Sequence, residues 1–270
     1  TKQDIEQMRS LLREALQAGA VGFSTGRSDN HRTSEGKDTP AANASHEELT
    51  GLAQAFQGLS HGVIQMVSDY NLLKGPSEFD AEFDLVEAMA TASGKALSLT
   101  WLQRDPGGEQ FVRIQERVDQ AVAKGLPLFM QTAARGIGVL NGLDASFHPF
   151  MGFPSYKEVA HLPLANRAEA LRDPSRKARI LSEKSERLAG DGSSIPPLVD
   201  ILLAKIDMIS GRMFPLEATL NYEPSVMESF LVRAKQKGVT PLEVIYDHLC
   251  AGNGDGLIYF PIFNYNAGNL

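Results

Sequence analysis

Polar side chains stand where the short apolar runs of this sequence end. They are Ser24 and Thr25, Ser68 and Asp69, Gln103 and Arg104, and Gln131 and Arg135. Guanidinium and amide groups can hold a carboxylate and an amide through paired hydrogen bonds, and Arg135 is our candidate for the carboxylate. If the runs are parallel strands, these groups meet at one edge of the sheet. The alternative is that each group only satisfies backbone atoms of its own loop.

Three further residues are candidates for the same site. His31 and Arg32 lie within the polar segment 26–44, and a connection of this length is uncommon unless it is functional or disordered. The pair could reach over the strand ends, or it could be an ordinary solvated surface pair. His148 precedes Pro149, which favours an extended backbone. It either contacts a substrate or packs as a hydrogen-bonded histidine.

Sequence signals for metal binding are lacking. The six histidines form no HxH, HxxH or HExxH pair, whereas a tight zinc site needs three or four converging ligands. No P-loop occurs either. Asp69 is either a general base or a cap for the next segment. We therefore assign no catalytic residue, and the spacing of the histidines gives no metal ligand. The residues that we expect to contact a substrate are His31, Arg32, Ser68, Asp69, Gln103, Gln131, Arg135 and His148.

Alternating strands and helices must position these groups. Apolar runs predict strands at 20–25, 62–69, 95–103 and from 127. Helical spacing and caps predict helices at 4–18, after Ser45, at 78–93 and at 108–123. Such alternation implies a parallel sheet, either doubly wound or part of a (β/α)8 barrel. No GxGxxG follows the first strand, which disfavours a dinucleotide-binding fold.

The regular alternation of predicted strands and helices ends after the strand near 127. We expect residues 1–133 to be consecutive β/α barrel units, with a glycine-rich loop at 136–142. Residues 134–222 then form a long, lid-like helical insertion, and residues 223–270 supply further barrel helices and a strand at 256–266. Ser225 with Glu228 and Thr240 with Glu243 predict the helix starts in the last region. We expect one domain overall, which is incomplete because the chain starts without an initiator Met.

Composition narrows the classes of partner. The 33 acidic and 26 basic residues give a net charge of −7, without the basic stripe that nucleic acid binding needs. No apolar run approaches the roughly 20 residues of a membrane span. Cys250 is the one cysteine, which we expect to be buried and structural, and its lack of an internal disulfide partner predicts the cytoplasm. A small-molecule substrate is the expected partner, and a homo-oligomer is possible.

Several stretches resemble one enzyme family. They are EALQAGAVGFSTG (14–26), RGIGVLNGLDASFHPF (135–150), LPLANRAEALRDP (162–174), PLEVIYDHLCAG (241–252) and IYFPIFNYNAGNL (258–270). Together they are similar to amidohydrolase family 3, the group of N-acyl-D-amino-acid deacylases (D-aminoacylase-like). In order, they cover nearly the whole chain.

The resemblance implies a partial (β/α)8 TIM barrel of the metal-dependent amidohydrolase type with bound zinc. A metal-activated water would hydrolyse a non-peptide C–N bond in an N-acyl amino acid or related small amide. The family's first zinc ligands and its proton-shuttling aspartate would lie outside this chain, so we expect a central fragment that is inactive by itself.

Where the family has histidines on two middle strands, this sequence has Val67 or Ser68 and Thr100 or Trp101. The zinc ligands therefore cannot be carried over, although Asp69 could act as a weak oxygen donor together with Gln103. One alternative is a metal-free barrel that binds a small molecule and has lost hydrolysis. Another is a TIM-barrel isomerase or lyase.

Overall fold

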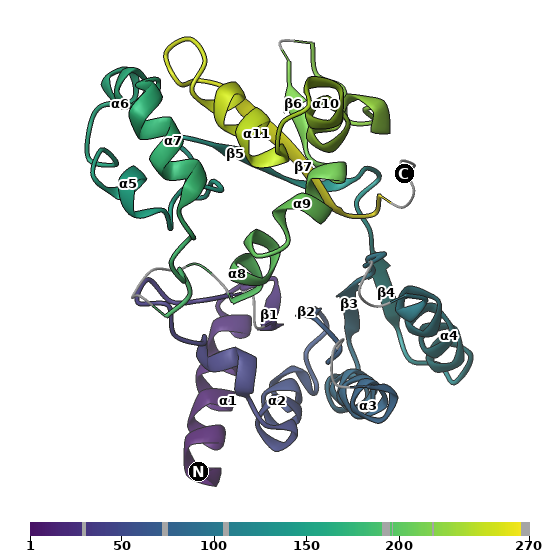
Figure 1. The fold of residues 1–270 in the computed structure, drawn as a ribbon. Helices are drawn as coiled ribbons and strands as arrows, with labels where there is room; N and C mark the ends of the chain where they lie inside the picture. Colours follow the sequence, from purple (N-terminus) through teal and green to yellow (C-terminus); the bar gives the residue numbers. More distant parts are fainter. Residues whose placement is uncertain are drawn as a thin grey trace. The chain divides into compact units, whose positions relative to one another are not determined.

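The computed structural model of the chain divides into two compact units (Figure 1). Unit 1 comprises residues 1–31 and 38–133, and unit 2 comprises residues 32–37 and 134–270. The structure describes residues 1–28, 31–71, 75–104, 108–190, 195, 197–217 and 219–265. No helix within these ranges has the length and apolar character needed to cross a bilayer. We expected one domain, whereas the second unit has a sheet and a core of its own.

Unit 1 is built on a sheet of four parallel strands in the order β1-β2-β3-β4. The strands are β1 (Gly22–Arg27), β2 (Val63–Ser68), β3 (Ala96–Thr100) and β4 (Leu128–Gln131). Each strand overlaps an apolar run of the sequence, and each pairs in parallel with its neighbour. The predicted α/β class with a parallel sheet is therefore confirmed.

The helices of unit 1 begin at the caps that the sequence supplies. They are α1 (Lys2–Gln17), α2 (His46–Ala53), α3 (Pro76–Ser93) and α4 (Gln110–Ala123), with short 3-10 turns η1 (Pro40–Asn43) and η2 (Gln54–Phe56). Thr1 caps α1, and the Asp4 side chain completes a capping box. The Ser45 hydroxyl accepts the Glu48 N–H at 3.1 Å. Gly94 ends α3 with a left-handed φ of +62°.

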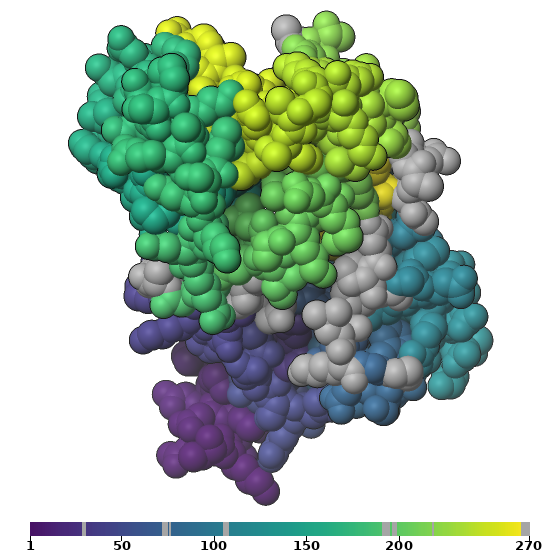
Figure 2. Space-filling model, viewed as in Figure 1, coloured from purple at the N-terminus to yellow at the C-terminus, as the bar shows by residue number. Residues whose placement is uncertain are grey.

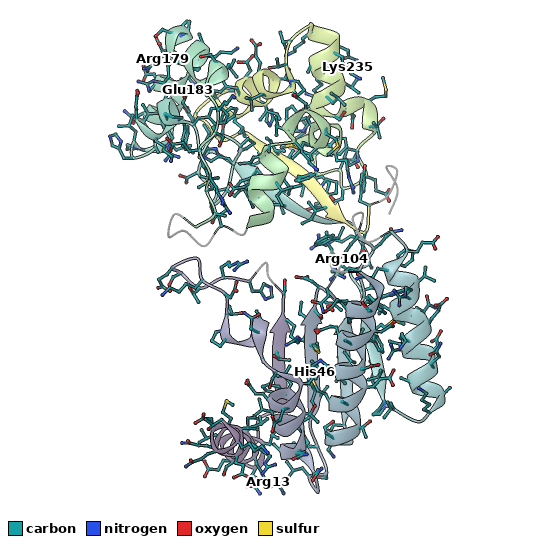
Figure 3. All side chains as sticks on the ribbon, turned by 60° about the horizontal axis from the view of Figure 1, so that its bottom comes forward. Arg13, His46, Arg104, Arg179, Glu183 and Lys235 are labelled. Atoms are coloured by element: carbon teal, nitrogen blue, oxygen red, sulfur yellow. The ribbon has the colours of Figure 1, made fainter. Side chains whose placement is uncertain are left out.

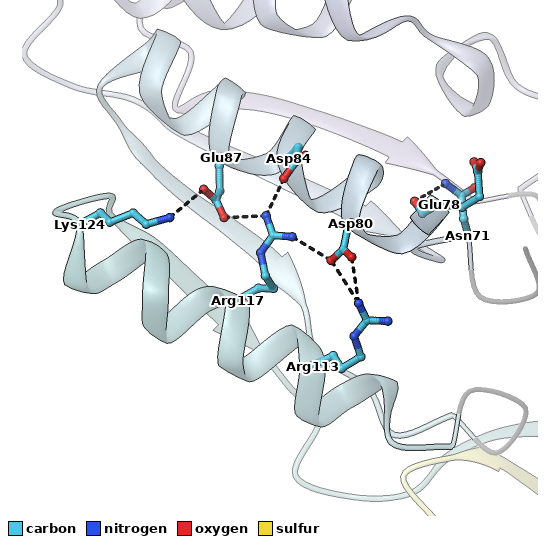
Figure 4. A network of polar contacts seen from close by, with 8 residues as sticks. All are labelled: Asn71, Glu78, Asp80, Asp84, Glu87, Arg113, Arg117 and Lys124. Carbon is cyan, nitrogen blue, oxygen red and sulfur yellow. Dashed lines mark hydrogen bonds and ion pairs between the residues drawn. The ribbon is translucent and has the colours of Figure 1, made fainter. Parts of the chain in front are cut away.

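These four helices form one layer on a single face of the sheet. In sequence order, α1 packs on α2 and α2 packs on α3. Arg117 of α4 then bridges to Asp80, Asp84 and Glu87 of α3, at 3.0, 2.7 and 2.9 Å (Figure 4). Right-handed crossovers between strands in sequential order place every connecting helix on the same side.

The two faces of the sheet consequently differ. Alternate residues of a strand point to opposite faces, and the helix side carries Ile64, Met66, Leu97 and Leu99, which are buried in the core. The other face carries an aligned row of Ser24, Gln65, Ser98 and Phe129. No helix of the described part of unit 1 covers this second face, and Phe129 is 56% exposed there.

Unit 2 contains an antiparallel sheet in the order β5-β7-β6. The strands are β5 (Ile137–Gly142), β6 (Phe214–Leu216) and β7 (Leu257–Phe263). We expected β7 to be a further barrel strand, but it pairs antiparallel with both neighbours. Sequence periodicity reveals a strand but not the direction of its partners.

Seven helices of the described part surround this sheet. They are α5 (Pro154–Lys157), α6 (Leu164–Leu171), α7 (Pro174–Ser182), α8 (Pro197–Leu203), α9 (Ile206–Ile209), α10 (Phe230–Lys237) and α11 (Pro241–Leu249), with 3-10 turns η4 (Ser210–Arg212) and η5 (Val226–Glu228). Lys177 of α7 pairs with Asp247 of α11 at 2.7 Å. Side chains of α7 and α11 accordingly meet on the surface, green against yellow in Figure 2.

Two local predictions in unit 2 differ from the structure. The expected glycine-rich loop at 136–142 is strand β5, because its glycines serve close packing: a Cβ on Gly138 would overlap the ring of Tyr259. Ser225 caps only the turn η5, and α10 starts later, where the Ser229 hydroxyl accepts the Val232 N–H. A serine before a helix identifies a cap but cannot tell which of two serines is used.

The remaining helix start and the cysteine agree with the sequence. Thr240 caps α11 by accepting the Glu243 N–H at 3.2 Å, and Pro241 occupies the first turn. Cys250 is buried directly after α11, and this burial raises the pKa of its thiol to about 12. A thiol in this state is protonated and inert at neutral pH.

Candidate functional site at the strand ends of unit 1

A buried ion pair joins the ends of β1 and β2 to helix α3. Glu82 is 3% exposed and binds Arg27 through two bonds, Nε to Oε1 at 2.7 Å and Nη2 to Oε2 at 3.0 Å. The Ser68 hydroxyl donates to Glu82 at 2.9 Å and accepts the Tyr70 N–H at 2.9 Å. Arg27 also donates to the Ala44 carbonyl. Ser68, which we predicted as a substrate contact, is therefore turned to the helix side and engaged within the protein.

The chain turns sharply after this pair. Tyr70 and Asn71 have φ values of +49° and +51°, which is uncommon for residues other than glycine and often accompanies functional sites. The Tyr70 ring packs on Phe79 and Phe83, with centroids 5.9 and 6.3 Å apart, and its hydroxyl donates to the Thr100 carbonyl at 3.4 Å. Burial raises the pKa of Tyr70 well above its usual range. This anchored turn fixes the end of β2.

Arg104 lies at the ends of β2 and β3 (Figure 3). It is 4% exposed, and its Nη2 donates to the Ser68 carbonyl at 3.1 Å. Burial lowers the pKa of this guanidinium, while the charge of nearby Asp69 raises it. Arg104 was absent from our predicted contacts, although it follows Gln103 at a strand end. That position, next to a chosen residue, was the signal that could have identified it.

The predicted residues His31 and Gln131 lie on the helix-free face. A Cβ on Gly26 would lie 3.3 Å from His31 Nδ1, so the imidazole rests against the end of β1. Gln131 pairs in register with Thr100 and lies two residues after the exposed Phe129, so both side chains are on the same face. Asp69 and Gln103 are half-buried residues that follow β2 and β3. Five of the eight predicted residues thus belong to the strand ends of unit 1.

The other three predicted residues, Arg32, Arg135 and His148, belong to unit 2. Arg32 is half-buried, and Arg135 is exposed and donates to the Gly136 carbonyl at 3.2 Å. His148 is 2% exposed and packs as a hydrogen-bonded histidine, which is the second of the two alternatives given above. Its Nδ1 accepts the Phe150 N–H at 3.2 Å, and its Nε2 bonds to the Tyr156 hydroxyl at 2.8 Å.

Burial and the positive charge of Arg167 lower the pKa of His148 to about 3. The imidazole is therefore neutral at pH 7. With both ring nitrogens bonded inside the protein, His148 is a packing residue of unit 2.

Residues 22–26, GFSTG, match the GxSxG pattern of a hydrolase nucleophile elbow. The elbow requires a sharp strand-to-helix turn, but Ser24 lies inside β1. Its hydroxyl donates to Gln65 Oε1 at 2.5 Å on the helix-free face. The match is therefore a strand sequence and supplies no nucleophile.

The residues at these strand ends do not fit a zinc ion. Within the described ranges, no group of three or more His, Cys, Asp and Glu side chains is placed so that it could hold a metal ion. Ser68 is bonded to Glu82, and the Trp101 indole donates to the Phe111 carbonyl at 2.8 Å. What the strand ends offer is a guanidinium, amides and a carboxylate, which suit binding and orientation of a polar molecule.

Comparisons of this chain with protein-family models, with curated proteins and with solved structures found no match. The resemblance to amidohydrolases therefore rests on the sequence stretches given above.

Proposed function

We propose that unit 1 is part of a (β/α)8 barrel whose strand ends bind a small amide that carries a carboxylate. We further propose that the protein acts as a hydrolase of non-peptide C–N bonds, on an N-acyl amino acid or related substrate. The observation that carries the barrel is the sequential parallel sheet with helices on one face only.

A doubly wound sheet would reverse its strand order and carry helices on both faces. A barrel keeps sequential order and places all helices outside. The row of Ser24, Gln65, Ser98 and Phe129 would then face the barrel interior. All-parallel sheets are normally covered on both faces, which supports further strands beyond β1 and β4.

The residues of unit 1 would hold the substrate rather than react with it. Arg104 would bind the carboxylate, since a nearly buried guanidinium pairs strongly with an anion. Gln103 and Gln131 would bond to the amide, and His31 would close the side at β1. Because the described residues do not fit zinc, we derive no hydrolytic step from them.

Titration calorimetry of the chain with N-acetyl-D-leucine and its L enantiomer tests this proposal. Loss of one charge-assisted contact in Arg104→Gln should weaken binding roughly tenfold or more. Arg9→Gln is the matched control, because Arg9 bonds to Gln54 among the helices at 2.7 Å. Absence of binding, or equal weakening in both variants, would contradict the proposed site.

A metal-free binding barrel is the second candidate. It is favoured by the lack of a metal-ligand group in the described residues. Metal analysis of the full-length protein and an assay for the amine that it releases separate the two candidates. Stoichiometric zinc with turnover supports the hydrolase, whereas ligand binding with neither metal nor turnover supports the binding protein.

A further inference from the structure

We infer that unit 2 contains a binding site for a small amphipathic monocarboxylate, separate from the strand ends of unit 1. The site is a cavity of about 550 Å³ between the turn η5 and the helices α10 and α11. This volume falls within the range of small-molecule pockets, roughly 300–1,000 Å³. Neither the barrel nor the hydrolase proposal uses this cavity.

One wall of the cavity is apolar and preformed. Phe230 and Val244 are buried, and the His248 ring packs edge-on against Phe230 with centroids 5.3 Å apart. His248 Nε2 bonds to the Leu257 carbonyl at 2.8 Å, and since a carbonyl only accepts, this nitrogen carries the proton. Met227 lies at the rim and is 65% exposed, a flexible side chain that could close over an alkyl chain.

The part of the lining that follows Phe230 along α10 is cationic. Arg233 and Lys237 lie four residues apart on α10, where two like charges are mildly destabilising by themselves. The Arg233 Nε donates to the Glu228 carbonyl at 3.0 Å, which leaves the outer guanidinium nitrogens available. Within the described part of the chain, neither Arg233 nor Lys237 has a carboxylate within ion-pair distance.

The charges that line the cavity favour a single negative charge in the ligand. Asp247 is paired with Lys177 at 2.7 Å, and Lys177 also contacts Glu243 at 3.0 Å. Glu228 and Asp247 both line the cavity, but neither forms an ion pair with Arg233 or Lys237. These two cations, next to an apolar wall, match a carboxylate with a hydrocarbon tail.

The test is an NMR titration of the whole chain, labelled at its methionine methyl groups, with octanoate as the probe. We expect saturable shifts of the Met227 signal, assigned from a Met227→Leu variant. The double variant Arg233→Gln/Lys237→Gln should bind roughly tenfold more weakly or worse, because it loses both cations. Octanol, which has the tail without the charge, should also bind more weakly.

Lys235→Gln is the matched control. Lys235 lies on the same last turn of α10 (Figure 3), but it is not among the residues that line the cavity. It should leave octanoate binding unchanged, and melting curves should show that all variants remain folded. The inference fails if roughly 10 mM octanoate leaves the Met227 signal in place. It also fails if Lys235→Gln weakens binding as much as the double variant, or if octanol binds equally well.

Discussion

The two faces of the parallel sheet in unit 1 carry opposite kinds of side chains, although both come from the same strands. The helix side is closed and mostly apolar, and among its polar groups Glu82 is bonded to both Arg27 and Ser68. The helix-free face carries Ser24 and Gln65 and an exposed Phe129. The first face therefore stabilises the fold, whereas no helix of the described part of unit 1 covers the second.

The largest contrast should appear between two phenylalanines. Phe83 is buried on the helix side, so Phe83→Ala should cost about 3–5 kcal/mol of the unfolding free energy of unit 1. Phe129→Ala on the open face should cost no more than about 0.5 kcal/mol. Fluorescence of Trp101, the one tryptophan of the chain, reports urea unfolding of unit 1. Similar losses in the two variants would break the distinction between the faces.

Removal of the buried carboxylate should have a slightly smaller effect. Glu82→Ala leaves Arg27 uncompensated in the core, and breaking such a pair costs about 3 kcal/mol or more. The same urea titration measures it. Glu116→Ala, on the exposed side of α4, is the control and should change the unfolding free energy by less than about 0.5 kcal/mol. If Glu82→Ala left the unfolding free energy nearly unchanged, water would have to reach Arg27 in the folded state.

His148 is buried in folded unit 2 and solvated in the unfolded chain, and this contrast predicts how pH affects the stability of unit 2. The pKa of His148 is lowered to about 3 in the folded state, against an ordinary value near 6.5, so the unfolded chain binds more protons. The contribution of His148 to the unfolding free energy of unit 2 is fully present above pH 6.5. Below pH 6.5 this free energy should fall by about 1.4 kcal/mol per pH unit, until about pH 3. The loss of unfolding free energy at pH 5 is therefore about 2 kcal/mol.

Hydrogen exchange of peptides from 148–182 measures this change. In His148→Asn the contribution should disappear, whereas His161→Asn, at an exposed position, should retain the slope. An unchanged slope in His148→Asn would show that another group is responsible.

The smallest effect is expected at the surface between α3 and α4. Arg117 contacts three carboxylates and lies 4.7 Å from the Phe83 ring centroid. Arg117→Ala should cost about 1 kcal/mol, and less in roughly 1 M salt, which screens exposed pairs. Lys124→Ala, whose contact with Glu87 is 3.8 Å long, should cost less still. Salt-independent losses would point to the ring contact instead.

Unit 1 was predictable because its signals are local. Apolar runs fixed the strands, and caps such as Ser45 and stops such as Gly94 fixed the helices. Unit 2 was less predictable: glycines at 136–142 look like a loop, and only the approach of Tyr259 shows why a strand needs them. Among the residues predicted to contact a substrate, His31 and Gln131 lie on the open face, whereas Ser68 faces the core.

The sequence by itself determined the elements of unit 1, their parallel pairing and the buried state of Cys250, because periodicity, caps and apolar runs act over a few neighbouring residues. Only the tertiary structure decided that β7 runs antiparallel to β5, that Glu82 engages Ser68, and that Arg104 is buried beside Asp69. These facts depend on contacts between residues far apart in the chain. The direction of a partner strand or the position of a buried charge leaves no local pattern in the sequence.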